Sequence, residues 1–249
     1  MHPPLNLMFD LDDTLIHCNI YFDQVIDRFV DLMEQWFTNN VIPREEIKKT
    51  QLQFDLAGIQ SKGFKAERFP ESLLETYEFY CHLTGRLTRA EEQSSLWQLG
   101  YSVYDSDFRL YPHVFQTLSQ LQREGHVLHL YTGGDPKIQR KKVEKVNLAP
   151  FFHDRIFVAQ HKNSEALEAI LRAHDIHRES SWMIGNSYRT DIIPALECDI
   201  GAIYIPPMST WAFDQIEIPS LENERFLHAT SIRNMPQVLK DYLYNERVR

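Results

Sequence analysis

The chain has 249 residues, of which 43% are hydrophobic, so it is long enough for one large domain or two smaller ones, and extensive disorder is not expected. Its formal net charge of −9 argues against non-specific binding to nucleic acid or to an anionic membrane surface. The three cysteines, Cys18, Cys81 and Cys198, show no CxxC spacing, so we expect neither disulfides nor a zinc site. No run of about 18 apolar residues occurs and the first residues do not resemble a signal peptide, so we expect a cytoplasmic protein.

Residues 5 to 9 are an apolar run that stops abruptly at three carboxylates, Asp10, Asp12 and Asp13. The run has the composition of a buried strand in a parallel sheet, and the carboxyl ends of such strands are where open α/β sheets bind ligands. Because strand residues alternate between faces, Asp10 and Asp12 are predicted to point the same way, whereas Asp13 is interpreted as a turn or backbone-bonding residue. Two converging carboxylates cost free energy unless a cation or a shared proton neutralises them, and because hard divalent ions prefer oxygen ligands the pattern favours a Mg²⁺ site.

Residues 19 to 104 are predicted to be almost entirely helical. Apolar residues recur there with the period of about 3.6 residues that is typical of helices packed on one face. The breaks between four predicted helices fall at Asn39 and Asn40, at residues 61–68, and at Gly85. An uninterrupted helical segment directly after the first strand indicates an insertion.

From residue 112 onward the pattern changes to an alternation of helices and strands, which builds a parallel sheet covered by helices on both faces. The expected helices are 112–124, 136–147, 164–173, 190–198 and a short one near 235–244, and the expected strands are 127–131, 155–159, 182–184 and 202–205. We therefore expect an α/β protein in which residues 1–17 and 105–249 form the sheet domain and residues 18–104 form a helical insertion.

Three further strand ends carry polar residues that suit an anion. Thr132 and Gly133 follow one strand, and a hydroxyl group with glycine backbone amides can bind phosphate oxygens. Lys162 follows the next strand, and its ammonium can neutralise the same anion. A third strand leads through Asn186 to Asp191, which brings another carboxylate to this edge of the sheet.

Taken in order, these residues resemble the motifs of the haloacid dehalogenase superfamily, which are DxDx[TV], a Thr or Ser at a strand end, a Lys, and an acidic loop of the GDxxxxD kind. The match spans nearly the whole chain. The resemblance implies a Rossmann-like parallel sheet flanked by helices, with the inserted helices forming a cap that closes over the active site. It points to the phosphatase-type members that carry a helical cap.

The resemblance also implies a role for each motif residue. Asp10 would be the nucleophile that becomes an aspartyl-phosphate, and Asp12 would be the general acid and base. Mg²⁺ would be bound by Asp10, the backbone carbonyl of Asp12, and Asp191. The implied phosphate contacts are Asp10, Thr132, Gly133 and Lys162.

Two positions depart from the family pattern. Position 186 is Asn where the family often has Asp, and because an amide carries no charge we keep Asn186 as a further candidate metal ligand of reduced strength. Asp199 stands where relatives commonly have a glycine, a departure that we expect to affect stability alone.

The second carboxylate of the first motif favours phosphate chemistry. Family members that dehalogenate 2-haloacids usually lack an Asp at the position of Asp12, since a halide leaving group needs no protonation. The expected function is therefore Mg²⁺-dependent hydrolysis of a small phosphate monoester, with phosphoglycolate, a sugar phosphate and a nucleoside monophosphate all compatible. The alternatives are a phosphosugar mutase or phosphotransferase of the same superfamily, and a non-catalytic protein that binds phosphorylated ligands because Asn186 has disabled the metal site.

We expect the partner to be a small phosphorylated metabolite, with neither nucleic acid nor a membrane involved, and the protein to be a monomer or homodimer. The basic run Lys137, Arg140, Lys141, Lys142 and Lys145 could be a nucleic-acid patch, but helical spacing puts Lys137, Lys141 and Lys145 on one stripe, which we interpret as the solvated face of a helix. The segment 61–68 is a candidate for recognising the leaving group, although an exposed loop with dispersed charges is at least as good an interpretation.

Overall fold

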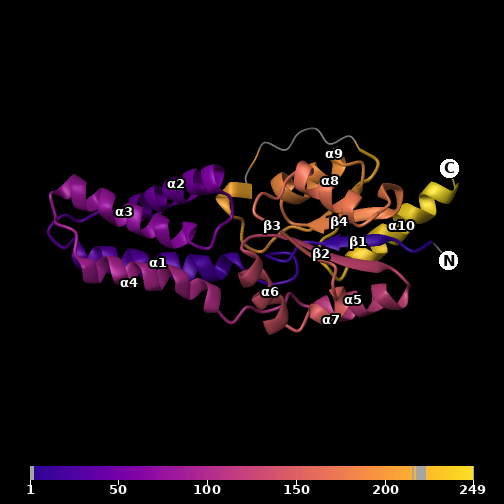
Figure 1. The fold of residues 1–249 in the computed structure, drawn as a ribbon, viewed down its shortest axis with the longest axis horizontal. Helices are drawn as coiled ribbons and strands as arrows, with labels where there is room; N and C mark the ends of the chain where they lie inside the picture. The colour runs from indigo at the N-terminus through magenta and orange to yellow at the C-terminus, as the bar shows by residue number, and fades with distance from the viewer. Residues whose placement is uncertain (1–2, 215, 217–222, 249) are drawn as a thin grey trace. The chain divides into compact units, whose positions relative to one another are not determined.

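The computed structural model describes residues 3–214, 216 and 223–248 (Figure 1). The chain divides into two compact units, one made of residues 1–19 and 108–249 and the other of residues 20–107. The sequence analysis had placed these junctions after residues 17 and 104. Each unit is described by itself below.

The first unit contains a six-stranded sheet in which every neighbouring pair of strands is parallel. The strand order is β3-β2-β1-β4-β5-β6. The strands are β1 (Asn6–Phe9), β2 (Val127–Gly133), β3 (Ile156–Ala159), β4 (Ser181–Gly185), β5 (Gly201–Tyr204) and β6 (Phe226–His228). The predicted α/β fold with a parallel, Rossmann-like sheet flanked by helices is confirmed.

The register of the central strands brings their carboxyl ends to one level. Phe9, the last residue of β1, pairs with Leu130 of β2 on one side and with Ile184 of β4 on the other. The backbone N–H of Asp10 donates to the carbonyl of Ile184 at 2.9 Å, which extends this pairing by one residue. The polar residues that follow β1, β2 and β4 therefore meet at one edge of the sheet.

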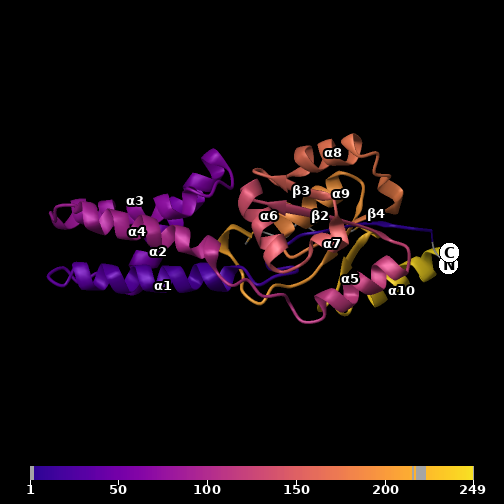
Figure 2. The same ribbon diagram turned by 60° about the horizontal axis from the view of Figure 1, so that its bottom comes forward.

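Helices cover both faces of this sheet (Figures 1 and 2). Those of the first unit are α5 (Val114–Arg123), α6 (Pro136–Lys145), α7 (Ala149–Phe152), α8 (Ser164–Ala173), α9 (Ile193–Glu197) and α10 (Met235–Val248). Helices α8 and α9 pack on one face, where Met8, Tyr131 and Met183 meet Leu167 and other apolar side chains. Helices α5, α7 and α10 lie on the other face, where Trp182 contacts Tyr242 of α10 with ring centroids 5.1 Å apart.

Three details differ from the sequence-based elements. The expected helix 190–198 is a π-helical turn (Tyr188–Ile192) followed by α9, and the N–H of Ile192 bonds to the carbonyl of Ser187 five positions earlier. Such π-turns occur frequently at functional sites and leave no sequence periodicity. The short elements α7 and β6 were also missed, because three or four residues are too few to show a periodic pattern.

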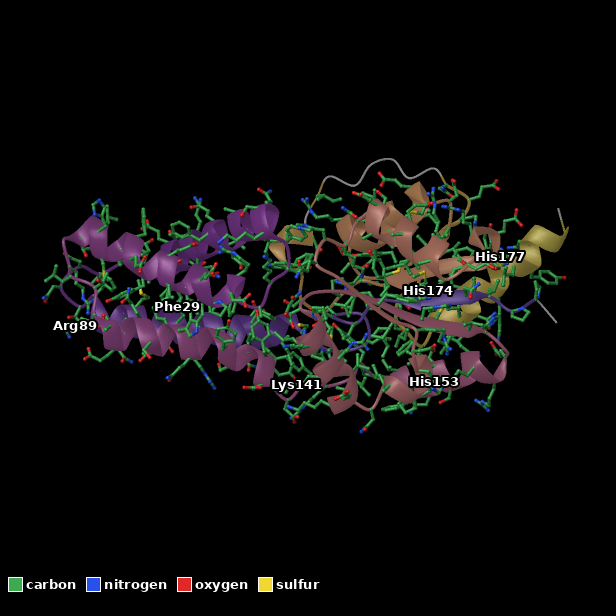
Figure 3. All side chains as sticks on the ribbon, in the orientation of Figure 1. Phe29, Arg89, Lys141, His153, His174 and His177 are labelled. Atoms are coloured by element: carbon green, nitrogen blue, oxygen red, sulfur yellow. The ribbon has the colours of Figure 1, made fainter. Side chains whose placement is uncertain are left out.

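The second unit consists of the helices α1 (Asn19–Trp36), α2 (Arg44–Lys62), α3 (Arg68–Thr84) and α4 (Ala90–Ser102), with a 3₁₀ turn at Val103–Asp105. Phe29, labelled in Figure 3, is fully buried among apolar side chains from α1, α3 and α4. The unit therefore has a hydrophobic core of its own. Within the described part of the chain, no helix is both long enough and apolar enough to span a bilayer.

Within the segment 61–68, residues 63–67 form a loop between two helices, and the exposed positions are Ser61, Lys62, Lys65 and Glu67. Lys62 ends α2 and Arg68 begins α3, and Arg68 is buried with an exposed fraction of 4%. Its guanidinium lies so close to the backbone of Gly58 that a methyl group there would overlap it, and it pairs with Glu71. Burial raises the pKa of the nearby Asp55 to about 7, an effect that the charge of Arg68 reduces. Arg68 is thus an internal residue of the helical unit, whereas the rest of the segment fits the expected exposed loop with dispersed charges.

Two adjacent stretches of backbone in the first unit connect it to the helices. Ile16 forms an antiparallel bridge with Leu110, and the N–H of His17 donates to the carbonyl of Arg109 at 2.8 Å. Asp13 supports this region, because its carboxylate accepts hydrogen bonds from the backbone N–H groups of Cys18 and Asn19 at 3.1 and 2.9 Å.

Candidate active site

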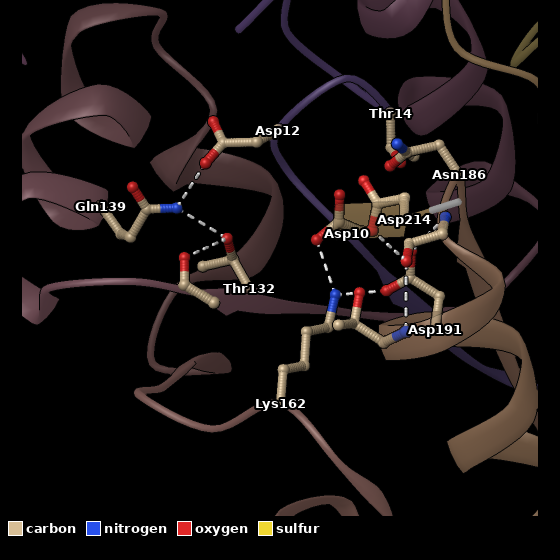
Figure 4. A network of polar contacts seen from close by, with 12 residues as sticks. Asp10, Asp12, Thr14, Thr132, Gln139, Lys162, Asn186, Asp191 and Asp214 are labelled. Atoms are coloured by element: carbon tan, nitrogen blue, oxygen red, sulfur yellow. Dashed lines mark hydrogen bonds and ion pairs between the residues drawn. The ribbon is translucent and has the colours of Figure 1, made fainter. Parts of the chain in front are cut away.

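Asp10 lies at the carboxyl end of β1 with its side chain directed at Lys162 (Figure 4). The residue is 6% exposed, and its carboxylate accepts a hydrogen bond from Nζ of Lys162 at 2.6 Å. Burial raises the pKa of Asp10 to about 8, because the favourable charge of Lys162 is partly cancelled by the nearby carboxylate of Asp191. In the absence of a further cation, this carboxyl group therefore takes up a proton more readily than an ordinary aspartate does.

Lys162 joins two of the predicted site residues, because its ammonium forms ion pairs with both Asp10 and Asp191. Burial alone would disfavour its charge, but the two carboxylates raise its pKa above the usual value, so that the ammonium persists. The residue precedes α8, whose first turn is capped by Asn163 accepting a hydrogen bond from the N–H of Ala166 at 2.9 Å. The start of α8 thus fixes Lys162 at this edge of the sheet.

The π-helical turn brings Asp191 back toward the end of β4. Its second carboxylate oxygen accepts a hydrogen bond from the backbone N–H of Ser187 at 2.9 Å. The same oxygen lies against Gly185, where a methyl group would overlap it. Glycine at the end of β4 is therefore a requirement of the site.

Asn186 is buried next to this turn, and its amide oxygen accepts a hydrogen bond from Oγ1 of Thr14 at 2.9 Å. Ser187 donates from its hydroxyl to Asp214 at 2.5 Å. Burial raises the pKa of Asp214 to about 6, the bond from Ser187 lowers it, and the charge of Asp191 raises it. Sequence analysis missed Thr14 and Asp214, although Thr14 stands within the first motif; Asp214 lies in a segment with no recognisable pattern.

Asp12 is held by a different set of partners from those of Asp10. Both of its carboxylate oxygens lie 2.9 Å from Nζ of Lys142, and Nε2 of Gln139 donates to one of them, also at 2.9 Å. Gln139 also donates to Oγ1 of Thr132 at 2.7 Å. Asp10 and Asp12 therefore lie close enough for the charge of Asp12 to raise the pKa of Asp10, yet each is paired with its own lysine.

The stripe of lysines that helical spacing predicts on α6 is confirmed as a solvated face, but the basic run also contains a buried lysine. Lys137, Lys141 and Lys145 are exposed, whereas Lys142 is 4% exposed. The inward face of α6 is formed by Gln139, Lys142 and Val143. Helical spacing leaves Lys142 off the exposed stripe, but only the tertiary position of Asp12 reveals its partner.

The carboxyl end of β2 offers some, but not all, of the groups that could bind an anion. Gly133 pairs with Ala159 of β3, and Thr132 points toward the same network as Asp12. The first N–H groups of α6 are not directed at an open site, because the side chain of Asp135 accepts hydrogen bonds from Lys137 and Ile138 at 2.8 and 3.2 Å. Phosphate binding at this edge would therefore rest on Thr132, Gly133 and Lys162 and not on the helix N-terminus.

Asp13 has the structural role that sequence analysis gave it. Its backbone is left-handed, with φ of 58°, and its carboxylate bonds to two backbone N–H groups. Burial raises its pKa to about 6, although these two bonds oppose the shift.

The oxygen donors of the site fit a hard divalent cation in their chemistry. Asp10, Asp191 and Asp214 supply three carboxyl groups near a single ammonium, and Asn186 adds an amide oxygen. Burial is the main cause of the raised pKa values of Asp10 and Asp214, the charge of Asp191 adds to both shifts, and a dication would oppose them. As these side chains are placed, no group of three or more His, Cys, Asp or Glu residues in the described part of the chain could by itself hold a metal ion.

The sequence matches a known protein family over most of its length. A family model described as haloacid dehalogenase-like hydrolase matches residues 6–199. No curated protein is similar enough to the sequence to count as a match.

Solved structures match over nearly the whole chain. A haloacid dehalogenase-like hydrolase from Xanthomonas campestris has a TM-score of 0.79 at 21% identity, covering 99% of this chain and 95% of its own. The HAD-hydrolase YfnB from Bacillus subtilis, in a magnesium-bound structure, has a TM-score of 0.62 at 19% identity, covering 96% and 99%. A 2-haloacid dehalogenase from Pseudomonas syringae has a TM-score of 0.60 at 16% identity, covering 96% and 100%.

Proposed function

The chain belongs to the haloacid dehalogenase-like hydrolase family, and on this basis we propose that it is a Mg²⁺-dependent phosphatase acting on a small phosphate monoester. The observation that carries the proposal is the arrangement at the end of β1. Asp10 contacts Lys162, which suits a nucleophile beside a phosphate-binding cation, and Asp12, two residues later, supplies a second carboxyl group.

Asp10 is the proposed nucleophile. A carboxylate oxygen of Asp10 attacks phosphorus, the bond from phosphorus to the substrate oxygen breaks, and an aspartyl-phosphate results. Lys162 and Thr132 hold the phosphate oxygens and orient them for in-line displacement. The ion pair between Lys162 and Asp191 fixes the ammonium in this position.

Asp12 is the proposed proton carrier. Its carboxyl group gives a proton to the leaving alkoxide, and the resulting carboxylate later takes a proton from the water that hydrolyses the aspartyl-phosphate. After both steps Asp10 and Asp12 return to their starting states and inorganic phosphate is released. This double use of one group is the reason that we favour a phosphatase over a dehalogenase, whose halide leaving group takes no proton.

Mg²⁺ is the proposed cofactor, with Asp10, the backbone carbonyl of Asp12 and Asp191 as ligands and Asn186 as a further candidate. When bound, it would reduce the repulsion between the nucleophile and the phosphate. Within this chain, Gly185 and Ser187 hold Asp191 where such a ligand is needed.

The helical unit is proposed to act as a cap that shapes the leaving-group pocket. Phosphoglycolate, a sugar phosphate and a nucleoside monophosphate are the substrate classes to test, with the protein acting in the cytoplasm on a small metabolite. The burial of Arg68 and its pairing with Glu71 remove that residue from the candidates for substrate recognition.

The decisive experiment is release of inorganic phosphate from a panel of phosphorylated metabolites with Mg²⁺, using the wild type and Asp10→Asn. We expect turnover of at least one monoester and its loss in the variant, because an amide cannot form the acyl phosphate, while the circular dichroism spectrum is unchanged. Isomerised sugar phosphate in place of free phosphate would instead identify a mutase. Binding of phosphorylated ligands without turnover would identify a non-catalytic protein.

A further inference from the structure

We propose that Lys142 and Gln139 of α6 are positioning residues that hold the Asp12 carboxyl group for proton transfer and tie it to Thr132. The inference rests on the proposed phosphatase function, in which Asp12 protonates the leaving group. It concerns residues outside the four motifs that the sequence analysis used.

Lys142 contacts both carboxylate oxygens of Asp12. The ammonium lies 2.9 Å from each of the two carboxylate oxygens, so it holds both and fixes the rotation of the group. Lys142 also lies over the ring of Phe108 at 4.8 Å and 3.5 Å from the sulfur of Cys18. Burying an ammonium costs free energy. Because Lys142 is 4% exposed and directed at one carboxylate, its contact with Asp12 is part of the packed interior and not a surface ion pair.

Gln139 connects Asp12 to the phosphate side of the site. One side-chain nitrogen donates to Asp12 at 2.9 Å and to Oγ1 of Thr132 at 2.7 Å, which uses both of its hydrogens. Gln139 and Lys142 are three residues apart on α6 and therefore share a face of the helix. The backbone of Gly134 allows the approach, because its φ is 137° and a methyl group there would lie 3.0 Å from Cγ of Gln139.

Without this clamp, defined here as Lys142 and Gln139, Asp12 would be free to turn toward water, since its side chain is 27% exposed. Misplacing a proton donor slows the steps that need the proton. An alkoxide is a poor leaving group and needs protonation as the bond to phosphorus breaks, whereas p-nitrophenolate is stable as an anion and needs little. The effect of removing the clamp should therefore depend on the leaving group.

The test compares two substrates in the same protein. We expect Lys142→Met to lower kcat/KM about 100-fold for the best alkyl phosphate of the metabolite panel, but less than about 10-fold for p-nitrophenyl phosphate. With p-nitrophenyl phosphate, the variant should also show a burst of p-nitrophenol, because hydrolysis of the aspartyl-phosphate still requires Asp12. The ratio of the two kcat/KM values does not change with the fraction of folded protein, so it remains meaningful if the variant is less stable.

The matched control is Lys141→Met, which makes the same substitution at the exposed neighbouring position of α6 and should leave both kcat/KM values within twofold of the wild type. Lys142→Arg should restore part of the alkyl activity, and Gln139→Met should reproduce a weaker form of the Lys142→Met pattern. Equal losses for the two substrates, or none, would overturn the inference while leaving the phosphatase proposal intact. A wild-type protein that releases phosphate from neither substrate would overturn both.

Discussion

The carboxylate of Asp191 rests against the backbone of Gly185, with no space between them for even a methyl group. Gly185→Ala must therefore push Asp191 away from Lys162 and from the N–H of Ser187. We expect kcat/KM for phosphate release to fall at least about 100-fold, since displacement by about an ångström has effects of this size.

Gly201 provides the matched control for this variant. A methyl group there would overlap the ring of Trp182, which lies in the core and not at the site. Gly201→Ala should therefore lower the free energy of unfolding by about 1–3 kcal/mol, as overpacking does, and leave kcat/KM at temperatures below unfolding within about twofold. Equal loss of activity in both variants would show that Gly185 acts through stability alone.

Binding of Mg²⁺ should release a proton. Because burial raises the pKa of Asp10 to about 8 in the metal-free protein, this group is largely protonated at pH 7 and must lose its proton to become a ligand. We expect a net release of protons on Mg²⁺ binding at pH 7, of at most one per ion from Asp10, and an apparent affinity that rises with pH up to about 8. Calorimetry in two buffers with different ionisation enthalpies measures the proton count, and Asp10→Asn should abolish it.

Asn186→Asp should tighten Mg²⁺ binding. The substitution keeps a group that can accept the hydrogen bond from Thr14 and replaces an uncharged oxygen donor with a carboxylate. We expect the Kd for Mg²⁺ to fall by about tenfold. The Asn147→Asp variant, at an exposed position, is the control and should leave the Kd unchanged. A Kd that does not change in Asn186→Asp would place residue 186 outside the metal site.

Asp55→Asn should stabilise the helical unit at high pH. A buried acid whose pKa is raised from 3.8 to about 7 favours the folded state below pH 3.8, and this contribution is lost as the pH rises through 7. At pH 8 we therefore expect the variant to exceed the wild type in free energy of unfolding by about 1–3 kcal/mol, and this advantage to shrink toward pH 4. Urea unfolding at the two pH values measures it, and Asp154→Asn, whose side chain is 92% exposed, should show no such difference.

The sheet and the residues at its carboxyl edge could be predicted from sequence because they depend on local pattern. Apolar runs ending in Asp10, Thr132 and Asn186 mark strands, and parallel pairing then forces these ends together. The positions of Lys162 and Asp191 followed from the same logic together with the family resemblance, and the structure does join them to Asp10.

The residues that could not be predicted depend on tertiary contacts between distant segments. Lys142 belongs to a run of basic residues that is typical of an exposed helix face, and its burial follows from the position of Asp12, 130 residues earlier. Asp214 reaches the site from a segment without periodicity, and Arg68 is internal because Gly58 leaves room for its side chain. In each case the sequence contains the residue but not the partner that decides its role.

The paired backbone at Ile16 and Leu110 has a consequence for how this protein can change. The chain leaves the sheet unit and returns to it at paired positions, so the segment 20–107 is an exchangeable module. A short turn in its place could join the two ends without changing the order of the strands. On the proposed role of these helices as a cap, selection for a new substrate would act by lengthening, shortening or replacing the module while the proposed reaction chemistry of the sheet is inherited unchanged.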